Sequence, residues 1–510
     1  MIFVTFKGIR TNKRTLATNN TDTVKKNKNF ACDLTFINMK KLQIFVALAA
    51  MMISAETFAG GLMTNTNQSA SFLRSVARGT SLDPDAVYFN PAGVVFMENG
   101  FHLGISDQIA YQTRTINSTF PAFAMGANNN GATSKDYVGK AFSAVIPNLH
   151  FAWKHNRFAV MAGIGVNGGG GSLEFENGLG SFERQFAVLP GAITQFGSSM
   201  GVTANQYAMD MYLKGSSMTL AFNVGAAYRI TDWLSVAAMV RFSTSSNGYE
   251  GYMKNITVNP SGAALGLSGN MMPASKFFNT VAEAFAQTNP QMAQTALTYA
   301  ALTSDHILDV KQKGFSVSPV LALAFHKDNW DASVKYEFKM GTELEIKSAE
   351  ASAKDAVING IFPDGAKVKS ETPALLAVAV SRQCGPVKIT AEWHEFFDKD
   401  AENSFSSAVK GNTMEYLLGA EWTVSERWLV SAGVQRTQLN LNESAYSDMN
   451  FSLPSWSFGV GFAFKINDLM RLNFGYMPTV YGKVTNKTAE FTDVYTRTSN
   501  AVGFGLDFKF

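Results

Sequence analysis

The sequence has few cysteines, few charges and no repeated long hydrophobic runs. Its two cysteines, Cys32 and Cys384, are too few for a disulfide-rich scaffold. Charged residues make up 16% of the 510 residues, below the roughly 25% of an average soluble protein. A bundle of membrane helices needs several apolar runs of about 20 residues, and only 42–55 approaches one. Hydrophobic residues nevertheless reach 46%, so the chain is too apolar to be disordered.

The first 59 residues have the features of a leader rather than of a domain. A basic start (39–41) precedes a short apolar core (42–53), and the small Ala59 marks a cleavage site. We therefore predict that 39–59 is a signal peptide. A single membrane anchor is the alternative, but the run is short for a bilayer. Residues 1–38 come before this start, and a misassigned start codon is the simplest explanation for them.

The basic character of the chain belongs to this leader. The whole chain has a net charge of +3, but the leader holds 9 of the 43 basic and 3 of the 40 acidic residues, which leaves the mature chain at −3. Phosphate binding needs a basic surface. Nucleic acid is therefore excluded as a partner. Loss of the leader also removes Cys32 and leaves Cys384 without a partner thiol.

Alternation of apolar with small or polar residues is the strongest signal after residue 99. Between Met218 and Ile230, for example, every second residue is apolar. Successive side chains of a strand point to opposite faces, so such a segment has one apolar face. The pattern predicts 14 strands, at 101–115, 141–153, 157–167, 216–230, 233–245, 313–326, 330–344, 370–384, 387–397, 411–424, 427–440, 453–466, 469–482 and 498–510.

The connections between these predicted strands alternate in length. Short turns on one side and long loops on the other are typical of outer-membrane barrels. A sheet in lipid must also close on itself, because its backbone has no water to bond. We therefore predict that 99–510 is an all-β domain, a 14-stranded antiparallel transmembrane β-barrel. The tight turns fall at 154–156, 231–232, 327–329, 385–386, 425–426 and 467–468.

Aromatic residues support a membrane setting. Five of the seven tryptophans lie within three residues of a predicted tight turn, and Trp393 and Trp456 lie near the opposite strand ends. Such rings favour the headgroup level of a bilayer. The last strand alternates up to the terminal Phe510, which resembles the signal read by the barrel-assembly machinery. With the signal peptide, this predicts a Gram-negative outer membrane, with its lipid and the assembly machinery as partners.

Residues 60–98 lack strand alternation. Their first part predicts a short helix with Asn67 or Ser69 as its cap and Gly79 as its stop. Their second part predicts an extended stretch that ends in an Asn-Pro turn. Two placements are open, a periplasmic tail or a plug inside the barrel. Because a barrel of 14 strands is too wide to be filled by its own side chains, we favour the plug.

Two motifs in this segment resemble a known family. Asn67-Gln68-Ser69-Ala70 with Arg74 and Ala77, followed by Asp85-Ala86 and Asn90-Pro91-Ala92-Gly93, is similar to the N-terminal signature of the FadL family. That family comprises outer-membrane transporters of long-chain fatty acids and related aromatic-hydrocarbon channels. The resemblance implies a 14-stranded barrel whose lumen is plugged by an N-terminal hatch, here 60–98, with Asn90, Pro91 and Ala92 at the hatch turn. Val87 departs from the pattern, because the family often has Ser or Thr there.

The resemblance also implies an outer groove, an inner pocket against the hatch, and a side exit at a kink in the third strand. A carboxylate headgroup would need a buried cation with directional donors, for which Arg74 and Arg78 are candidates. The acyl pocket could be lined by Phe72, Leu73, Val76, Tyr88 and Phe89. The alternative is that the arginines pair with wall carboxylates and that the apolar residues only anchor the hatch.

Two further regions fit this scheme. The loop 246–312 contains apolar residues at helical spacing, which predicts a landing surface for ligand at the outer rim, at Phe277, Phe278 and Phe285. The alternative is that they pack the loop onto the barrel mouth. Gly163, Gly165 and the run 168–171 favour a bulge in the third strand, with ordinary loop flexibility as the alternative.

Together these features predict passive, gated uptake of hydrophobic small molecules, with long-chain fatty acids first. Aromatic-hydrocarbon uptake, a general diffusion porin, and an adhesin or structural barrel are the alternatives. The six histidines show no paired metal spacing, and no Gly-x-Ser-x-Gly motif occurs. We therefore predict a monomer that is not an enzyme, with no catalytic residue, no metal and no cofactor. An outer-membrane hydrolase is kept as a minor alternative.

Overall fold

The computed structural model describes residues 62, 64–443, 446–449 and 451–510. The predicted extension at 1–38 and the predicted signal peptide at 39–59 lie outside the described residues.

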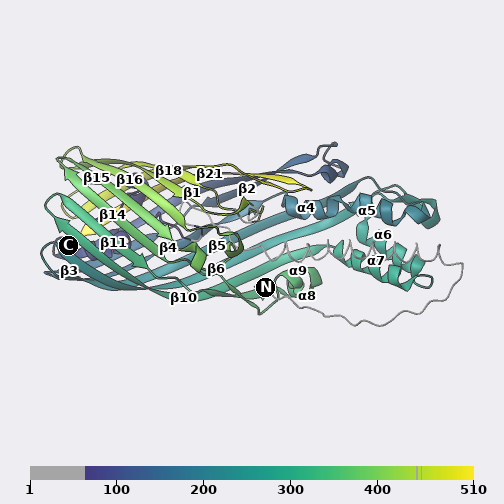
Figure 1. Ribbon diagram of the computed structural model, residues 1–510, viewed down its shortest axis with the longest axis horizontal. Helices are drawn as coiled ribbons and strands as arrows, with labels where there is room; N and C mark the ends of the chain where they lie inside the picture. Colours follow the sequence, from purple (N-terminus) through teal and green to yellow (C-terminus); the bar gives the residue numbers. More distant parts are fainter. Residues whose placement is uncertain (1–61, 63, 444–445, 450) are drawn as a thin grey trace, which may run out of the picture. The chain divides into compact units, whose positions relative to one another are not determined.

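The wall of the molecule is one antiparallel sheet that closes on itself (Figure 1). Strand β1 pairs with β21 from His102↔Lys509 to Thr119↔Thr492, so the first and last strands meet. Four wall strands are each split in two, as β2/β3, β11/β12, β13/β14 and β19/β20, which gives 14 in all. The 14 predicted strands are confirmed. The wall consists of β1 (Gly100–Thr119), β2 (Ser134–Ser143), β3 (Asn148–His155), β4 (Phe158–Phe175), β5 (Tyr207–Arg229), β6 (Leu234–Val258), β10 (His306–Lys327), β11 (Trp330–Glu337), β12 (Glu343–Ser348), β13 (Lys367–Lys369), β14 (Leu375–Cys384), β15 (Val387–Phe396), β16 (Thr413–Thr423), β17 (Trp428–Gln438), β18 (Ser455–Lys465), β19 (Met470–Tyr481), β20 (Val484–Lys487) and β21 (Thr492–Lys509).

The outer face of this wall is apolar and the inner face is largely polar. On β10 the outward Phe315, Val317 and Leu321 are 63%, 48% and 49% exposed, whereas the inward Ser316 and Ser318 are buried. This is the reverse of a water-soluble fold, and it is the distribution that a wall surrounded by lipid requires. The predicted alternation therefore places the apolar side chains against the membrane.

The two ends of the barrel differ (Figure 1). The tight connections lie at the end where the chain terminates, and four exposed tryptophans lie beside them, Trp233, Trp330, Trp422 and Trp428. The long loops lie at the other end. They carry η2 (Pro121–Met125), α4 (Gly180–Ala187), α5 (Leu189–Phe196), η3 (Ser198–Met200), β7 (Ser261–Gly262), η4 (Ala263–Leu265), β8 (Leu267–Ser268), β9 (Met272–Pro273), α6 (Ala274–Phe285), α7 (Pro290–Leu302), α8 (Glu350–Lys354), α9 (Ala356–Ile361), η5 (Asp398–Asp400) and η6 (Ser406–Ala408). None of the helices in the described ranges has both the length and the apolar character that a membrane crossing requires.

The N-terminal segment (residues 64–98) contains α2 (Ala70–Ser75), α3 (Ala86–Phe89) and η1 (Pro91–Phe96). Ser69, one of the two predicted caps, accepts a hydrogen bond from the Phe72 amide at 3.0 Å. The helix ends before the predicted stop because Val76 adopts a left-handed φ of 55°, which is rare for a β-branched residue. The predicted extended stretch is wrong, since the Tyr88 and Phe89 amides bond back to the Asp85 carbonyl and form α3.

Candidate substrate site

The N-terminal segment contacts the inner wall on several sides. Helix α2 approaches β16, β17, β18, β19, β21 and β1, whereas η1 approaches β3, β4, β5, β6 and β10. Nearly every residue from 64 to 81 and from 85 to 95 is buried. These strands include opposite parts of the ring, and the segment leaves little of its own surface open to water.

A row of glycines on the inner wall allows α2 to come this close. A Cβ atom at Gly433 would lie 1.9 Å from the Ser75 carbonyl oxygen, and one at Gly459 would lie 2.7 Å from that of Leu73. These are backbone atoms that cannot rotate away. Cross-strand pairing places the glycines in line, as Gly419–Gly433–Gly459 and Gly461–Gly475–Gly503.

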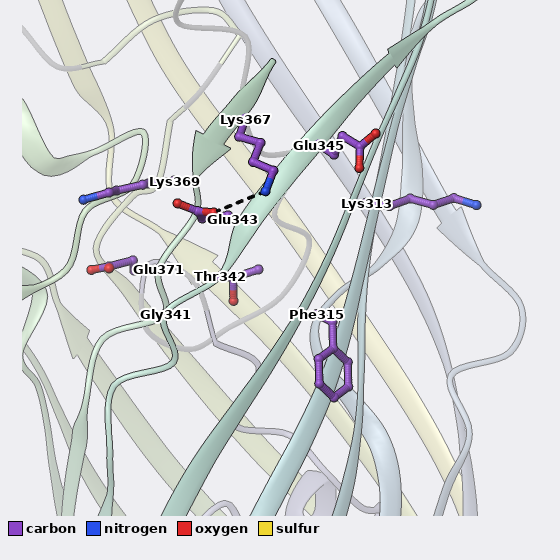
Figure 2. A pocket seen from close by; sticks show the side chains of 9 residues that line it. All are labelled: Lys313, Phe315, Gly341, Thr342, Glu343, Glu345, Lys367, Lys369 and Glu371. Carbon is purple, nitrogen blue, oxygen red and sulfur yellow. Dashed lines mark ion pairs between the residues drawn. The ribbon is translucent and has the colours of Figure 1, made fainter. Parts of the chain in front are cut away.

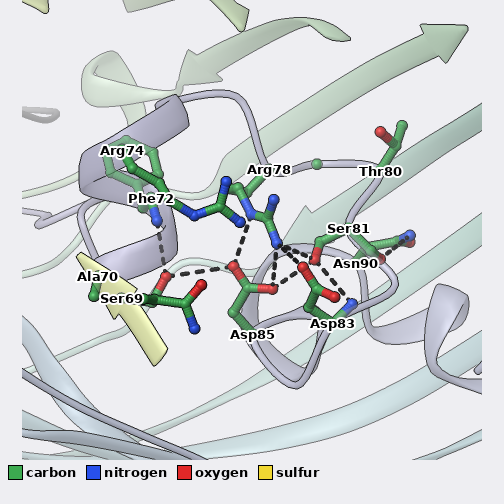
Figure 3. A network of polar contacts seen from close by, with 12 residues as sticks. Ser69, Ala70, Phe72, Arg74, Arg78, Thr80, Ser81, Asp83, Asp85 and Asn90 are labelled. Atoms are coloured by element: carbon green, nitrogen blue, oxygen red, sulfur yellow. Dashed lines mark hydrogen bonds and ion pairs between the residues drawn. The ribbon is translucent and has the colours of Figure 1, made fainter. Parts of the chain in front are cut away.

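Arg78 is the centre of an ion-pair network within the segment (Figure 3), and the network continues to Glu421 of β16. Arg78 pairs with Asp85 at 2.8 Å, with Asp83 at 2.7 Å and with Glu421 of β16 at 3.0 Å. Burial alone would lower the pKa of Arg78, but the carboxylates of Asp85, Glu421 and Asp83 outweigh it and raise the pKa well above its ordinary value. Arg78 therefore stays charged and holds the two halves of the segment together.

Asp83 joins this network to the next part of the wall. Its second carboxylate oxygen pairs with Arg471 at 2.7 Å. Burial would raise the pKa of Asp83, but the guanidinium groups of Arg471 and Arg78 lower it below its ordinary value. The carboxylate is thus ionised at neutral pH, and it links the segment to β19.

Arg74 has a different set of contacts. Its Nη1 pairs with Glu421 at 2.5 Å and donates to Ser431 Oγ at 2.5 Å. Its Nε and Nη2 are buried and have no hydrogen-bond partner among the described residues. Both predicted headgroup arginines thus pair with a wall carboxylate, which was the alternative in the sequence analysis. Arg74 has two further N–H donors, on Nε and Nη2, that make no hydrogen bond among the described residues. A headgroup role for either arginine stays a prediction.

The five apolar residues predicted for an acyl pocket come together. Phe72, Leu73, Val76, Tyr88 and Phe89 form one buried cluster, and the wall completes it with Leu417, Met477 and Ala501. The Phe72 and Phe89 rings stack with centroids 5.5 Å apart. The cluster contains side chains of both the segment and the wall, so it can serve either as a ligand pocket or as an anchor.

Charged wall residues that the sequence did not single out surround Tyr88. The Lys335 ammonium lies 4.6 Å from the Tyr88 ring and donates to the Tyr88 carbonyl at 2.9 Å. The Arg241 guanidinium lies 5.2 Å from the same ring. Arg241 and Lys335 both pair with Glu337. The ring is therefore held between two cations.

The predicted hatch turn is a short, capped element. The Asn90 side chain accepts from the Gly93 amide at 3.2 Å and donates to the Ser81 carbonyl at 3.1 Å. Pro91 begins η1, and the Ala92 carbonyl accepts from Ser235 Oγ of β6 at 2.6 Å. The turn thus joins two parts of the segment and fixes them to the wall.

The three phenylalanines predicted at the outer rim lie on α6, away from the N-terminal segment. Phe277 and Phe278 are buried, and the Phe278 ring stacks on Tyr299 of α7 at 5.2 Å. Phe285 is half-buried. Packing of α6 on α7 thus involves Phe278, whereas the alternative expected these residues to pack the loop onto the barrel mouth. A ligand-landing role stays a prediction.

The third wall strand, β4, is kinked where its glycines lie. Pairing of β3 with β4 ends at Asn148↔Gly165, and pairing of β2 with β4 starts again at Phe142↔Ser172. Between them β4 has two register shifts against β5, and Gly169 and Gly170 have φ of +66° and +111°. The predicted bulge is confirmed, and we call this place the β4 interruption (residues 143–147 and 166–171).

The N-terminal segment covers the β4 interruption from inside. The Asn65 amide donates to the Asn167 carbonyl at 2.9 Å, and its side chain donates to the Gly169 carbonyl at 2.8 Å. The Gln68 side chain donates to the Val166 carbonyl at 2.7 Å. Three carbonyls of β4, where this strand no longer pairs with β3 or β2, thus accept hydrogen bonds from a different part of the chain.

A second interruption occurs between β10 and the β11/β12 strand. Pairing stops at Lys313↔Glu345 and resumes at Val320↔Glu337, and we call this the β10 interruption (residues 314–319 and 338–344). An open pocket of about 490 Å³ lies over it (Figure 2). Its lining is mainly charged and consists of Lys313, Phe315, Gly341, Thr342, Glu343, Glu345, Lys367, Lys369 and Glu371.

A further pocket of about 480 Å³ lies at the tight-turn end, against the N-terminal segment. Asp83, Pro84 and Met97 line one side, and Arg471 and Trp428 line the other. The Asp83–Arg471 pair lies in its lining, so a path through this end would have to break ion pairs. No group of three or more potential metal ligands occurs in the part of the chain that the structure describes.

Comparison with solved structures identifies the class of fold. The chain is similar to a FadL homologue from Pseudomonas aeruginosa, with a TM-score of 0.59 at 13% identity over 88% of this chain and 100% of that one. It is also similar to the P. putida toluene transporter TodX, with a TM-score of 0.50 at 13% identity over 84% of this chain and 95% of that one. The fold is therefore the 14-stranded barrel that the FadL resemblance predicts. No family model and no curated protein sequence matches the chain.

Proposed function

We propose that the protein is a passive uptake channel for hydrophobic small molecules in a Gram-negative outer membrane. The N-terminal segment acts as its hatch, and the β4 interruption acts as its exit. The observation that carries this proposal is that the side chains of Asn65 and Gln68 bond carbonyls of β4 where its pairing with β3 and β2 is broken.

The free energy that holds the β4 interruption closed is similar to the free energy that ligand binding can supply. Three neutral hydrogen bonds of about 1 kcal/mol each hold the segment at the interruption. Burying about four methylenes, at about 0.8 kcal/mol each, gives a similar gain. A long apolar ligand that enters the cluster around Phe72 and Phe89 can therefore offset the cost of opening this side. On the β16 side the ion pairs of Arg78 are harder to break.

The exit is also apolar. Inside, Ile146, Val166 and Ala110 form a small buried cluster at the interruption. Outside, Phe142 and Val145 are 61% and 65% exposed. A hydrophobic ligand that leaves sideways would thus move between apolar surfaces without entering water, and this favours the lateral route over the tight-turn end.

Long-chain fatty acids are the first substrate class in this proposal, because Arg74 keeps two buried donors next to the apolar cluster. Neutral aromatic hydrocarbons are the second, since one solved relative in fold is named a toluene transporter. A general diffusion porin fits poorly with a bore crossed by a buried segment. A non-enzymatic monomer, assembled through a signal at Phe510, is part of the same proposal.

The test compares the mature chain with a variant that lacks 60–98. We expect the intact barrel to take up dodecanoate or toluene into vesicles and to show little ion conductance in planar bilayers. The truncated barrel should conduct ions freely. Equal conductance of the two forms would refute the hatch, and a lack of uptake of either probe would refute the transport function.

A further inference from the structure

Two arginines lie side by side on adjacent strands of the inner wall, between the apolar cluster of the N-terminal segment and the long loops. Arg114 of β1 and Arg497 of β21 are direct partners in the ladder, and they are only 1% and 6% exposed. Like charges directly opposite each other destabilise a sheet. Such a pair in a buried position indicates a site that an anion can complete.

Arg497 has unused donors. Its Nε and Nη2 are buried and have no hydrogen-bond partner among the described residues. Its guanidinium lies 4.6 Å from the centroid of the Tyr481 ring, and the Tyr481 hydroxyl is also buried with no hydrogen-bond partner in the described part of the chain. A buried donor that makes no bond is unfavourable, so two such neighbours point to a ligand that accepts from both.

The nearest acidic residue along β21 is already engaged. Asp493 pairs with Arg184 of α4 at 2.8 Å and accepts from the Tyr495 hydroxyl at 3.3 Å. Arg114 is oriented by Gln112, whose Oε1 accepts from its Nε at 3.1 Å, and by the Phe451 ring at 5.3 Å. The two guanidinium groups are therefore set in place by aromatic rings and an amide, and no carboxylate of the described residues forms an ion pair with Arg497.

The position of Arg497 matches an amphiphilic ligand. It lies four residues before Ala501, which belongs to the apolar cluster of the N-terminal segment. Four residues of a strand span about 13 Å. An acyl chain whose headgroup binds Arg497 could thus extend along the inner wall and reach Phe72 and Leu73.

We propose that Arg497, Tyr481 and Arg114 form an anion site in the upper lumen that binds the carboxylate of a long-chain amphiphile. The proposal rests on the proposed uptake function and names its substrate class, a monocarboxylate rather than a neutral aromatic hydrocarbon. The planar guanidinium fork binds a carboxylate through two parallel hydrogen bonds, and the Tyr481 hydroxyl donates a third. In this proposal the carboxylate of the ligand binds at this site first, and its acyl chain then binds in the apolar cluster.

The test compares dodecanoate with dodecanol, which has the same chain and no charge, by equilibrium binding to the full chain in detergent. Charge-assisted hydrogen bonds predict that the wild type prefers dodecanoate by about tenfold or more. R497Q should abolish this preference and leave dodecanol affinity within about twofold. The matched control is R436Q, because Arg436 also stacks on an aromatic ring, Trp456 at 5.3 Å, but lies on the outer face.

Two further variants keep the test decisive if R497Q does not fold. Y481F removes one donor and should lower the preference by about threefold to tenfold. R497K keeps the charge but loses the fork, so it should give an intermediate preference. The anion site would be overturned if R497Q still preferred dodecanoate over dodecanol as strongly as the wild type does. If R497Q does not fold, the same result in Y481F would overturn it. A wild type that binds both probes equally would also overturn the anion site, but it would leave the uptake function standing. Failure of both probes to bind would contradict the uptake function itself.

Discussion

The β4 and β10 interruptions break the same wall in similar ways but are closed by different means. At the β4 interruption three carbonyls of β4 are bonded by Asn65 and Gln68 of the N-terminal segment. At the β10 interruption the wall closes itself, since a Cβ atom at Gly314 would lie 2.5 Å from the Glu343 carbonyl oxygen. The first closure can be removed by a movement of one segment, and the second cannot.

The outer surfaces of the two interruptions are alike in part. Phe142 and Val145 make the outer edge of the β4 interruption apolar, and Phe315 and Val317 do the same at the β10 interruption. Lysines and glutamates line the pocket over the β10 interruption as well (Figure 2). In our proposal the removable cover, rather than a break in strand pairing or an apolar edge alone, makes the β4 interruption the exit.

The largest expected effect comes from two disulfide tethers, one at each interruption, which should differ in their effect on uptake. In a C384S background, Q68C/G165C puts one thiol on the N-terminal segment and one on β4, at positions where Gln68 Oε1 and an added Cβ atom at Gly165 would lie 2.8 Å apart, and the fraction of the two thiols that is joined is measured first by thiol titration. We expect oxidation to reduce dodecanoate uptake by about tenfold or more, since the cover can no longer move, and a reductant to restore it. The measurement is uptake into vesicles before and after reduction.

The matched control is G314C/L344C at the β10 interruption, where the corresponding distance to Leu344 Cδ2 is also 2.8 Å. This tether should leave uptake unchanged, because the wall there is already closed by its own backbone. If both tethers block uptake equally, or if neither does, the distinction between the two interruptions is wrong.

The second prediction concerns the opposite side of the N-terminal segment, where it rests on β17. Gly433→Val places a side chain where the Ser75 carbonyl lies 1.9 Å from the added Cβ, so α2 must move. We expect a loss of about 1–3 kcal/mol in stability and a measurable ion leak in planar bilayers. Ala432→Val is the control, because residue 432 faces outward. If Gly433→Val changes neither the stability nor the ion leak, α2 does not need the close contact with Gly433.

The third prediction tests the ion pairs on that side. The pKa of Asp83 is lowered in the fold, so its contribution to stability is present above its unfolded pKa of about 3.8 and is lost as pH falls below it. D83N should lower the stability by about 1–2 kcal/mol at pH 7 and remove this acid dependence, as followed by thermal unfolding. D468N breaks only an exposed turn pair with Lys465 and should change neither. An equal effect of the two variants would argue against an anchoring role for Asp83.

The barrel could be predicted from the sequence because its signals are local. Alternation with a period of two gave the strands, and loop lengths gave their order, since neither depends on distant contacts. The cap at Ser69 was readable for the same reason. The glycines show the limit of this reasoning. Gly169 and Gly433 look alike in a strand, yet one permits a bulge and the other receives α2.

The site was predicted only in part, because its contacts join residues far apart in the chain. Arg74 and Arg78 were identified, but their partner Glu421 lies more than 340 residues away. Arg241, Lys335 and Arg497 are inward positions of ordinary strands, where any polar residue satisfies the pattern. Only the folded ring shows which of them meet Tyr88 and which face each other across a ladder.

The smallest expected effect comes from the individual hydrogen bonds of the cover. Together with a bond to the Asn65 carbonyl inside the segment, Gln68→Ala removes the neutral bond to the Val166 carbonyl, worth about 1 kcal/mol. Because this bond holds only the closed form, its loss should favour opening and raise the uptake rate by up to about fivefold at subsaturating dodecanoate. Ser333→Ala is the matched control, since the Ser333 hydroxyl of β11 donates to the Gly79 carbonyl of the segment at 2.6 Å, on a different part of the wall. It should destabilise the fold by a similar amount and leave the uptake rate unchanged. If Ser333→Ala accelerates uptake as much as Gln68→Ala does, the segment moves as a whole, and the β4 interruption has no special part in opening.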